Sequence, residues 1–139
     1  MDTKLDVQRV ERSVILSLRS QVLSMPNARV TTFSRDGAAD TRHWAALLDN
    51  TVVGCASVMR LRGWALRGMA VGPDYRRQGI GARLLHTICT EVQQPMWCNA
   101  RLTAASFYER HGWTAVRPIF PMNDEMPHQR MVWRPDEQG

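Results

Sequence analysis

The sequence predicts one domain of the α/β (α+β) class, in which helices pack on a central sheet. Its 139 residues are enough for a single core. Three apolar runs separated by short turns in residues 43–71 indicate an antiparallel meander. Residues 79–93 then repeat apolar side chains at helical spacing, and short strand and helix patterns follow. We therefore expect residues 1–139 to form one layered domain.

The first elements along the chain are expected to be a helix and a loop. Apolar residues recur at three- and four-residue spacing at Val7, Val10, Val14, Leu18 and Val22. Pro26 should end this helix. Residues 27–42 are mostly polar, which predicts a loop with a short strand near 29–33.

The strands of the meander are expected at residues 43–48, 51–60 and 64–71. Asp49-Asn50 is typical of a hairpin turn between the first two strands. Gly68 lies inside the third strand, which indicates a bulge or a close approach of another backbone.

After the meander, the sequence predicts alternating helices and short strands. The expected helices are residues 79–93, which end before Pro95, and residues 103–111, which Gly112 closes. The expected strands are residues 96–99, 113–117 and 129–134.

The composition is typical of a globular domain. Hydrophobic residues make up 44% of the chain and charged residues 22%. No apolar run approaches the ~20 residues of a membrane span, and the charged N-terminus lacks the apolar region of a secretory signal. We therefore expect a cytoplasmic protein without a membrane partner.

Thiol and imidazole groups indicate neither a disulfide framework nor a metal site. Cys55, Cys89 and Cys98 show no CxxC spacing. The four histidines show no HxxxH or HExxH pairing. We expect reduced thiols and no bound metal.

The net charge of +5 is typical of a protein that binds a phosphorylated ligand or a nucleic acid. Between Asn50 and Thr90 the sequence has six arginines and a single acid, Asp74, so positive charge centres on residues 75–81. These arginines are not interleaved with stacking aromatic residues in the pattern of a known nucleic-acid module. We therefore expect a phosphorylated ligand and no nucleic acid.

Residues 75–81, YRRQGIG, predict an anion-binding loop at the start of a helix. The first N–H groups of a helix have no intrahelical partner and carry partial positive charge. Gly79 and Gly81 allow a ligand to approach the main chain, and Arg76 and Arg77 add positive charge. The segment fits neither GxGxxG nor GxxxxGK[ST]. The structural alternative is a flexible helix entry flanked by solvated arginines.

Two motifs resemble the GNAT superfamily of N-acetyltransferases. Residues 76–81, RRQGIG, match its Arg/Gln-x-x-Gly-x-Gly/Ala signature, and residues 66–71 resemble the strand that precedes it. Residues 104–113, AASFYERHGW, resemble its A-x-x-F/L-Y-x-x-x-G-F/W segment. The resemblance implies a mixed, mostly antiparallel sheet flanked by helices, with an acetyl-CoA-binding core at about residues 52–116.

By this resemblance, the anion is the pyrophosphate of acetyl-CoA, used as a cosubstrate. The backbone amides implied in holding it are those of Gln78, Gly79, Ile80, Gly81 and Ala82. Arg76 and Arg77 suit the pyrophosphate or the 3′-phosphate, and the sequence does not distinguish these two roles.

The resemblance also implies contacts for the pantetheine arm. Backbone groups of Met69 and Val71, on either side of Ala70, would pair with it as an added strand. Arg101 occupies the position where many members carry an asparagine that contacts the pantetheine. Asn99 fits the variant NARxxAxxFY and is the alternative contact.

Tyr108 is the general acid that the resemblance implies, because a phenol with an ordinary pKa of about 10 can protonate the departing thiolate. The alternative is a tyrosine that only packs the helix on the sheet. The N–H of Met69 or Val71 would stabilise the oxyanion.

The general base is not marked in the sequence. His128, with Glu125 nearby, is a base or acceptor contact by resemblance to a subgroup, and a structural histidine is the alternative. His43 is a weaker candidate for the base. Cys98 is expected to be a buried, inert thiol.

The implied reaction moves an acetyl group from CoA to a primary amine of a small molecule or a protein, directly through a tetrahedral intermediate. A non-catalytic acyl-CoA-binding regulatory module is the alternative, since no acidic residue marks a base on residues 64–71. The identity of the acceptor and the choice between monomer and homodimer stay open.

Overall fold

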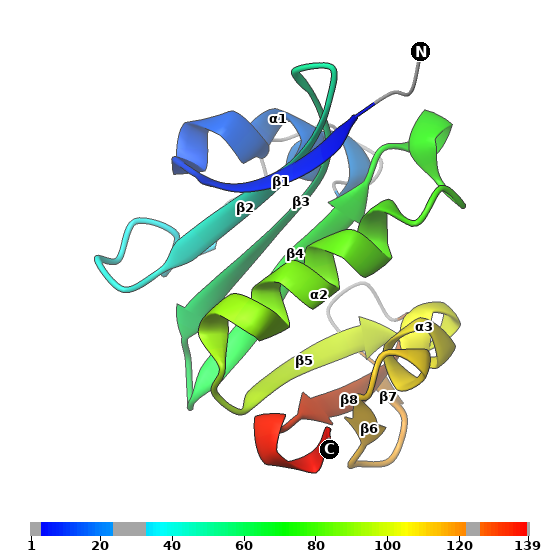
Figure 1. The fold of residues 1–139 in the computed structure, drawn as a ribbon. Helices are drawn as coiled ribbons and strands as arrows, with labels where there is room; N and C mark the ends of the chain where they lie inside the picture. The colour runs from blue at the N-terminus through cyan, green and yellow to red at the C-terminus, as the bar shows by residue number, and fades with distance from the viewer. Residues whose placement is uncertain (1–3, 24–32, 122–125, 139) are drawn as a thin grey trace.

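The structure, a computed structural model, describes residues 4–23, 33–121 and 126–138. Within these residues, eight strands form one mixed sheet in the order β1-β2-β3-β4-β5-β8-β6, with β7 paired to β8 (Figure 1). The strands are β1 (Leu5–Val10), β2 (Arg42–Leu48), β3 (Thr51–Arg60), β4 (Trp64–Val71), β5 (Met96–Arg101), β6 (Thr114–Ala115), β7 (Phe120–Pro121) and β8 (Pro127–Trp133). The helices are α1 (Arg12–Leu23), α2 (Ile80–Val92) and α3 (Ala105–Arg110), with 3-10 turns at Pro73–Tyr75, Leu102–Ala104 and Pro135–Glu137. The mixed α/β class, with a mostly antiparallel sheet, is confirmed.

Helices cover both faces of the sheet (Figure 1). On one face, Ile80, Leu84 and Ile88 of α2 pack against the core that contains Trp44 and Val53. On the other face, residues of α1 pack against Ala45, Cys55 and Ala70. Because β3 is covered on both sides, its central residues form an unbroken buried run instead of an alternating one.

The N-terminal helix predicted from residue 7 onward was wrong for its first turns. Residues Leu5–Val10 form the edge strand β1, which pairs antiparallel with β2, and α1 begins only at Arg12. Leu5 and Val7 pack toward the α2 side of the sheet, which is the two-residue repeat of a strand. Val14, expected on the buried face, is 40% exposed, while Arg19 is fully buried.

The meander and the helix after the glycine loop are confirmed. Asp49 and Asn50 both have positive φ, 49° and 69°, as a two-residue hairpin turn requires. The last expected strands are shifted: the segment predicted at 113–117 is reduced to β6, and β7 was not anticipated. The helix predicted at 103–111 consists of a 3-10 turn followed by α3. The short strand expected near 29–33 falls almost wholly outside the described residues.

The strands β4 and β5 are parallel neighbours that share only two register pairs, Trp64↔Met96 and Ala65↔Trp97. Beyond Trp97, β5 stays paired with β8 as far as Arg101↔His128, and β4 stays paired with β3. The two strands therefore part, as Figure 1 shows between β4 and β5. On the other side of β4, the register with β3 is irregular between the pairs Cys55↔Ala70 and Ser57↔Arg67.

The expected bulge at Gly68 is confirmed. Its φ is 67°, a conformation that glycine adopts without strain. A Cβ at this position would lie 2.9 Å from Arg19 Nε and 3.1 Å from the Phe33 ring. A side chain is therefore excluded where β4 departs from β5.

Candidate active site

A cleft of roughly 790 Å³ occupies the space where β4 and β5 part. Its residues come from both faces of the sheet: Gly81, Phe107 and Tyr108 belong to α2 and α3, whereas Leu23 and Phe33 belong to α1 and the segment after it. The predicted site residues that line it are Met69, Ala70, Val71, Arg76, Gly81, Asn99, Tyr108 and His128. One cavity thus unites predicted site residues that are up to 59 positions apart in the sequence (69 to 128).

The glycine loop ends where α2 begins, at Ile80, with Gly79 as the preceding residue at φ 78°. No side chain caps this end of the helix, so its first N–H groups keep the partial charge and the unmet hydrogen bonds of a helix start. Arg77 also has positive φ, 63°, which turns the chain into the helix. The local sequence therefore builds a glycine loop that leads directly into an uncapped helix start, which the prediction of an anion site requires.

The other loop residues lie beside the cleft and do not line it. Arg77, Gln78 and Gly79 are exposed, whereas the Ile80 side chain is buried in the core under α2. For Ile80, and for Ala82 in the first turn, only the backbone amide can serve a ligand. Arg76 lies at the cleft, where its Nε donates to the Val71 carbonyl at 3.4 Å.

Gly81 faces the aromatic ring of Phe107 across the entrance to the cleft. A Cβ built at Gly81 would be 3.4 Å from two carbons of that ring. The close distance leaves room for little more than a methyl group at this position.

Tyr108 lies on α3 and is 7% exposed. Burial raises the pKa of its phenol above the ordinary range, and the neighbouring Cys98 thiol, which is hydrogen-bonded to the phenol, adds to this shift. Phe107 stacks on Tyr108 with ring centroids 5.2 Å apart, and Trp113 contacts it edge-on at 5.4 Å. The phenol is thus fixed in one orientation and keeps its proton at neutral pH.

Cys98 is buried beside Tyr108, and burial raises the pKa of its thiol to about 12. A thiol with this pKa carries almost no nucleophilic thiolate at neutral pH. The expectation of an inert thiol at this position therefore agrees with its surroundings.

Asn99 and Arg101 both line the cleft. The side-chain carbonyl of Asn99 accepts a hydrogen bond from Arg130 Nε at 3.0 Å, which orients the amide. Of the two candidate pantetheine contacts, Asn99 is closer in sequence to Trp97, where the pairing of β4 with β5 ends.

His128 is 6% exposed at the start of β8 and lines the cleft. Its Nδ1 lies 2.7 Å from the Met126 carbonyl. Because a carbonyl only accepts, Nδ1 carries the proton, and in the neutral ring Nε2 has the free lone pair. Glu125, suggested beside it, lies outside the described residues.

His43, the weaker base candidate, does not line the cleft. It is buried at 6% exposure, with Nδ1 2.6 Å from Ser57 Oγ and Nε2 3.1 Å from the Asp36 carbonyl. Burial lowers the pKa of His43, more than the carbonyl and carboxylate of Asp36 raise it. His43 therefore has a structural role, in a buried polar cluster with Arg19, Asp36 and Ser57.

Several lining residues were not anticipated, above all Phe33, Arg62, Arg67 and Trp97. Phe33 lies between two guanidinium groups, with Arg19 Cζ 4.3 Å and Arg67 Cζ 4.2 Å from its ring centroid. The arginine-rich character of residues 50–90 was the one sequence signal for Arg62 and Arg67. Nothing in the local sequence pattern marks Phe33 or Trp97.

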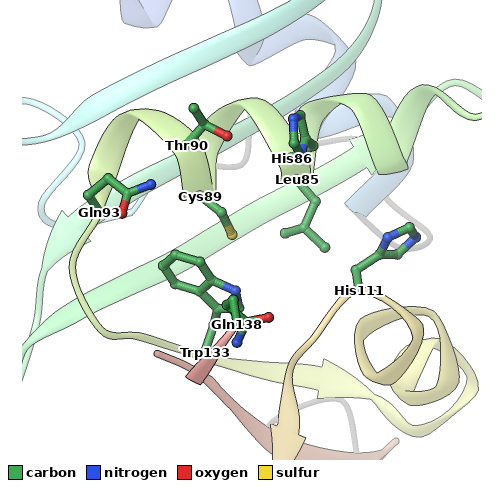
Figure 2. A pocket seen from close by; sticks show the side chains of 8 residues that line it. All are labelled: Leu85, His86, Cys89, Thr90, Gln93, His111, Trp133 and Gln138. Atoms are coloured by element: carbon green, nitrogen blue, oxygen red, sulfur yellow. The ribbon is translucent and has the colours of Figure 1, made fainter. Parts of the chain in front are cut away.

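A second, smaller cavity of roughly 230 Å³ lies between α2 and the C-terminal segment (Figure 2). Leu85 and Cys89 point into it from α2, and Trp133 and Gln138 border it from the C-terminal segment, as Figure 2 shows. It contains none of the predicted site residues. Within the described part of the chain, no group of three or more histidine, cysteine or acidic side chains is placed to hold a metal ion, and no helix there is long and apolar enough to cross a membrane.

The cleft between parting parallel strands, with an uncapped helix start and a buried tyrosine beside it, is the arrangement that the resemblance to acyltransferases implies. The chain belongs to the GNAT acetyltransferase family, because the family model described as "Acetyltransferase (GNAT) domain" matches residues 39–115. It is therefore an N-acetyltransferase domain of that family.

Two curated relatives agree with this assignment. The chain is 29% identical over 100 residues to the uncharacterized N-acetyltransferase YitI of Bacillus subtilis, a match that covers 63% of this chain and 67% of the relative. It is 32% identical over 141 residues to the mycothiol acetyltransferase of Nocardiopsis dassonvillei. That match covers 88% of this chain and 42% of the relative, so the chain spans less than half the length of mycothiol acetyltransferase.

Solved structures share the fold. Escherichia coli ElaA superposes with a TM-score of 0.80 at 18% identity, covering 94% of this chain and all of ElaA (100%). An aminoglycoside 6′-N-acetyltransferase complexed with coenzyme A superposes with a TM-score of 0.71 at 17% identity, covering 91% of this chain and 95% of that one.

Proposed function

We propose that this protein transfers an acetyl group from acetyl-CoA to a primary amine, directly and through a tetrahedral intermediate. The observation that carries the proposal is the single cleft, which joins the uncapped start of α2, the Tyr108 phenol and the α1 side of the sheet. A donor and an acceptor that enter from opposite faces of the sheet would meet at Tyr108. The coenzyme A in a protein of the same fold supports this use of the cleft.

The proposed cofactor contacts follow the geometry of the loop and of β4. The amides of Gln78 through Ala82 hold the pyrophosphate at the start of α2. Arg76 and Arg77 add charge there or at the 3′-phosphate. Backbone groups of Met69 and Val71, on the side of β4 that β5 leaves unpaired, extend the sheet with the pantetheine arm. Asn99 contacts the same arm from β5.

The proposed catalytic groups surround the thioester position. The N–H of Met69 or Val71 donates to the oxyanion. The Tyr108 phenol, which its surroundings keep protonated, donates its proton to the departing sulfur. His128 Nε2 accepts the proton of the amine, because the Met126 carbonyl fixes the tautomer that leaves Nε2 unprotonated. The three thiols of the chain are free, as a reducing cytoplasm favours.

Thermal shift and thiol release test the proposal. Acetyl-CoA and CoA should each raise the melting temperature, an oligonucleotide should not, and a panel of amines should then release free thiol from acetyl-CoA. Binding of acetyl-CoA without amine-dependent release from any member would favour the non-catalytic acyl-CoA-binding module. Stabilisation by the oligonucleotide alone would contradict both.

A further inference from the structure

The cleft walls carry positive charge at both ends. Among the described residues that line it there are four arginines and no aspartate or glutamate; the arginines are Arg62, Arg67, Arg76 and Arg101. Arg76 lies at the glycine loop, where the phosphates of the donor are expected. Arg62 and Arg67 lie at the opposite end, toward the start of β4. The donor therefore accounts for only part of this charge.

Arg67 is too far along β4 to serve the phosphates. It lies four residues before Val71, a separation of roughly 13 Å at the strand rise of about 3.3 Å per residue. Its guanidinium stacks on Phe33, on the α1 side of the sheet. An acceptor that enters from this side meets Arg67 before it reaches Tyr108.

The nearby carboxylate of Asp36 does not neutralise Arg67 by an ion pair. One Asp36 oxygen accepts from Arg19 Nη1 at 2.7 Å and from the Phe33 N–H at 2.7 Å, and the other accepts from Arg19 Nη2 at 3.1 Å. Within the described chain, Arg67 makes no salt bridge. The buried pair of Arg19 and Asp36 together with the half-buried Arg67 thus carries one net positive charge, and Arg67 is the member of this group that lines the cleft.

At the end of the cleft where Arg62 and Arg67 lie, the wall formed by β5 is also positively charged. Trp97 lines the cleft with Arg130 Cζ 4.3 Å and Arg62 Cζ 5.8 Å from its ring centroid. Burial, and then the charges of Arg117 and Arg62, lower the pKa of Arg130, as expected where cations gather. A cationic acceptor would be repelled from both walls.

We propose that the acceptor is a small amine that also carries an anionic group, a carboxylate or a phosphate, which pairs with Arg67 and, at the mouth of the cleft, with Arg62. The planar guanidinium of Arg67, held on Phe33, suits bidentate pairing with either anion. This inference rests on the proposed acetyl transfer. It adds the chemical class of the acceptor and makes Arg67 the specificity-determining residue.

The test compares amines that differ in the anionic group. The pairs are L-leucine with L-leucinamide and O-phosphoethanolamine with ethanolamine, and spermidine serves as a polycation. Rates of thiol release give kcat/KM for the wild type and for Arg67→Gln, Arg67→Lys and Arg62→Gln. Arg134→Gln, at an exposed position outside the cleft, is the control for the loss of one charge. Thermal shift with acetyl-CoA is recorded for each variant.

We expect the anionic member of at least one pair to be favoured by about 10- to 100-fold, the range of a charge-assisted hydrogen bond. A preference for leucine over leucinamide would run against intrinsic reactivity, because a larger fraction of leucinamide than of leucine carries a neutral amine at the same pH. The responding pair distinguishes carboxylate from phosphate. Arg67→Gln should abolish the preference, Arg67→Lys should keep part of it, and Arg134→Gln should leave it unchanged. The acetyl-CoA shift should be the same in all four variants.

Preference for the neutral amines or for spermidine would overturn the inference and leave acetyl transfer intact. So would a preference for anions that survives Arg67→Gln, or turnover of neutral amines with no turnover of either anionic amine. Failure of acetyl-CoA to bind the wild type would instead contradict the proposed function itself. If Arg67→Gln does not fold, two measurements still test the inference. They are the preference of the wild type within each amine pair and the weaker preference expected of Arg62→Gln, at an exposed position.

Discussion

Arg19 of α1 and Asp36 form a buried ion pair in which Nη1 lies 2.7 Å from Oδ2, with both side chains at most 1% exposed. Arg19 Nη2 also donates to Ser57 Oγ at 2.8 Å. The Asp36 carboxylate accepts from the Phe33 N–H, so the pair fixes the segment that carries Phe33 against the cleft. A structural ion pair on one face of the sheet thereby shapes the α1 side of the cleft.

Asp36→Asn should destabilise the protein by about 3–5 kcal/mol, because it leaves the Arg19 charge buried without its counter-ion. The matched control is Asp40→Asn, which removes an exposed pair with Arg35 at 3.3 Å and should cost less than about 1 kcal/mol. Urea unfolding gives both free energies. Equal, small losses of unfolding free energy in the two variants would mean that the buried pair stabilises the protein no more than the exposed pair does.

His43 should make the protein less stable in mild acid. Burial lowers its pKa in the folded state, more than Asp36 raises it, with further lowering by Arg19 and Arg12. Its contribution is therefore present above the unfolded-state pKa of about 6.5 and is lost as the pH falls toward the lower folded pKa. His43→Gln should flatten the dependence of the unfolding free energy on pH between about 5 and 7. An unchanged slope in this variant would assign the acid sensitivity to other groups.

Gly81→Glu should abolish stabilisation by acetyl-CoA. The added carboxylate would lie at the start of α2 beside Phe107, where it competes with the pyrophosphate for the same amides. Wild type should gain about 2.7 kcal/mol at a hundredfold excess over Kd. Gly81→Ala, whose Cβ would sit 3.4 Å from the Phe107 ring, is the control and should keep most of the gain. A folded Gly81→Glu protein with the full thermal shift would show that the loop does not bind the anion.

Arg76→Ala and Arg77→Ala should separate the two phosphate roles. If either side chain contacts the 3′-phosphate, its variant should bind CoA more weakly while its affinity for dephospho-CoA stays near that of wild type. The effect should grow at low salt, because exposed charges are screened. Calorimetric titration with both ligands measures it. Equal losses for the two ligands would restrict these arginines to the pyrophosphate or to a general field.

Tyr108→Phe should lower kcat by roughly ten- to a thousandfold while acetyl-CoA affinity and stability stay near wild type. The ring keeps its contacts with Phe107 and Trp113, and only the hydroxyl is lost. Because burial raises the pKa of Tyr108 above its ordinary value, the phenol should produce no alkaline limb in the wild-type rate profile below about pH 10. A variant with a wild-type rate would make Tyr108 a packing residue.

The sequence alone determined the features whose physics is local. The glycine loop depends on residues 75–81 and on the helix that follows directly, so its pattern predicted its local geometry. The meander is equally local, because Asp49-Asn50 favours a tight hairpin turn. The motif that contains Phe107 and Tyr108 likewise placed the buried phenol on the predicted short helix.

Only the tertiary structure decided what depends on partners distant in sequence. Leu5–Val10 became a strand because β2, more than thirty residues later, offers an edge to pair with, and this pairing outweighs an apparent helical repeat. The cleft exists because β4 and β5 stop pairing after Ala65↔Trp97, a matter of register that no local pattern encodes. Arg67 lines the cleft without a salt bridge among the described residues, while Asp36 is bound to Arg19, and these three residues meet only when α1 packs on the sheet.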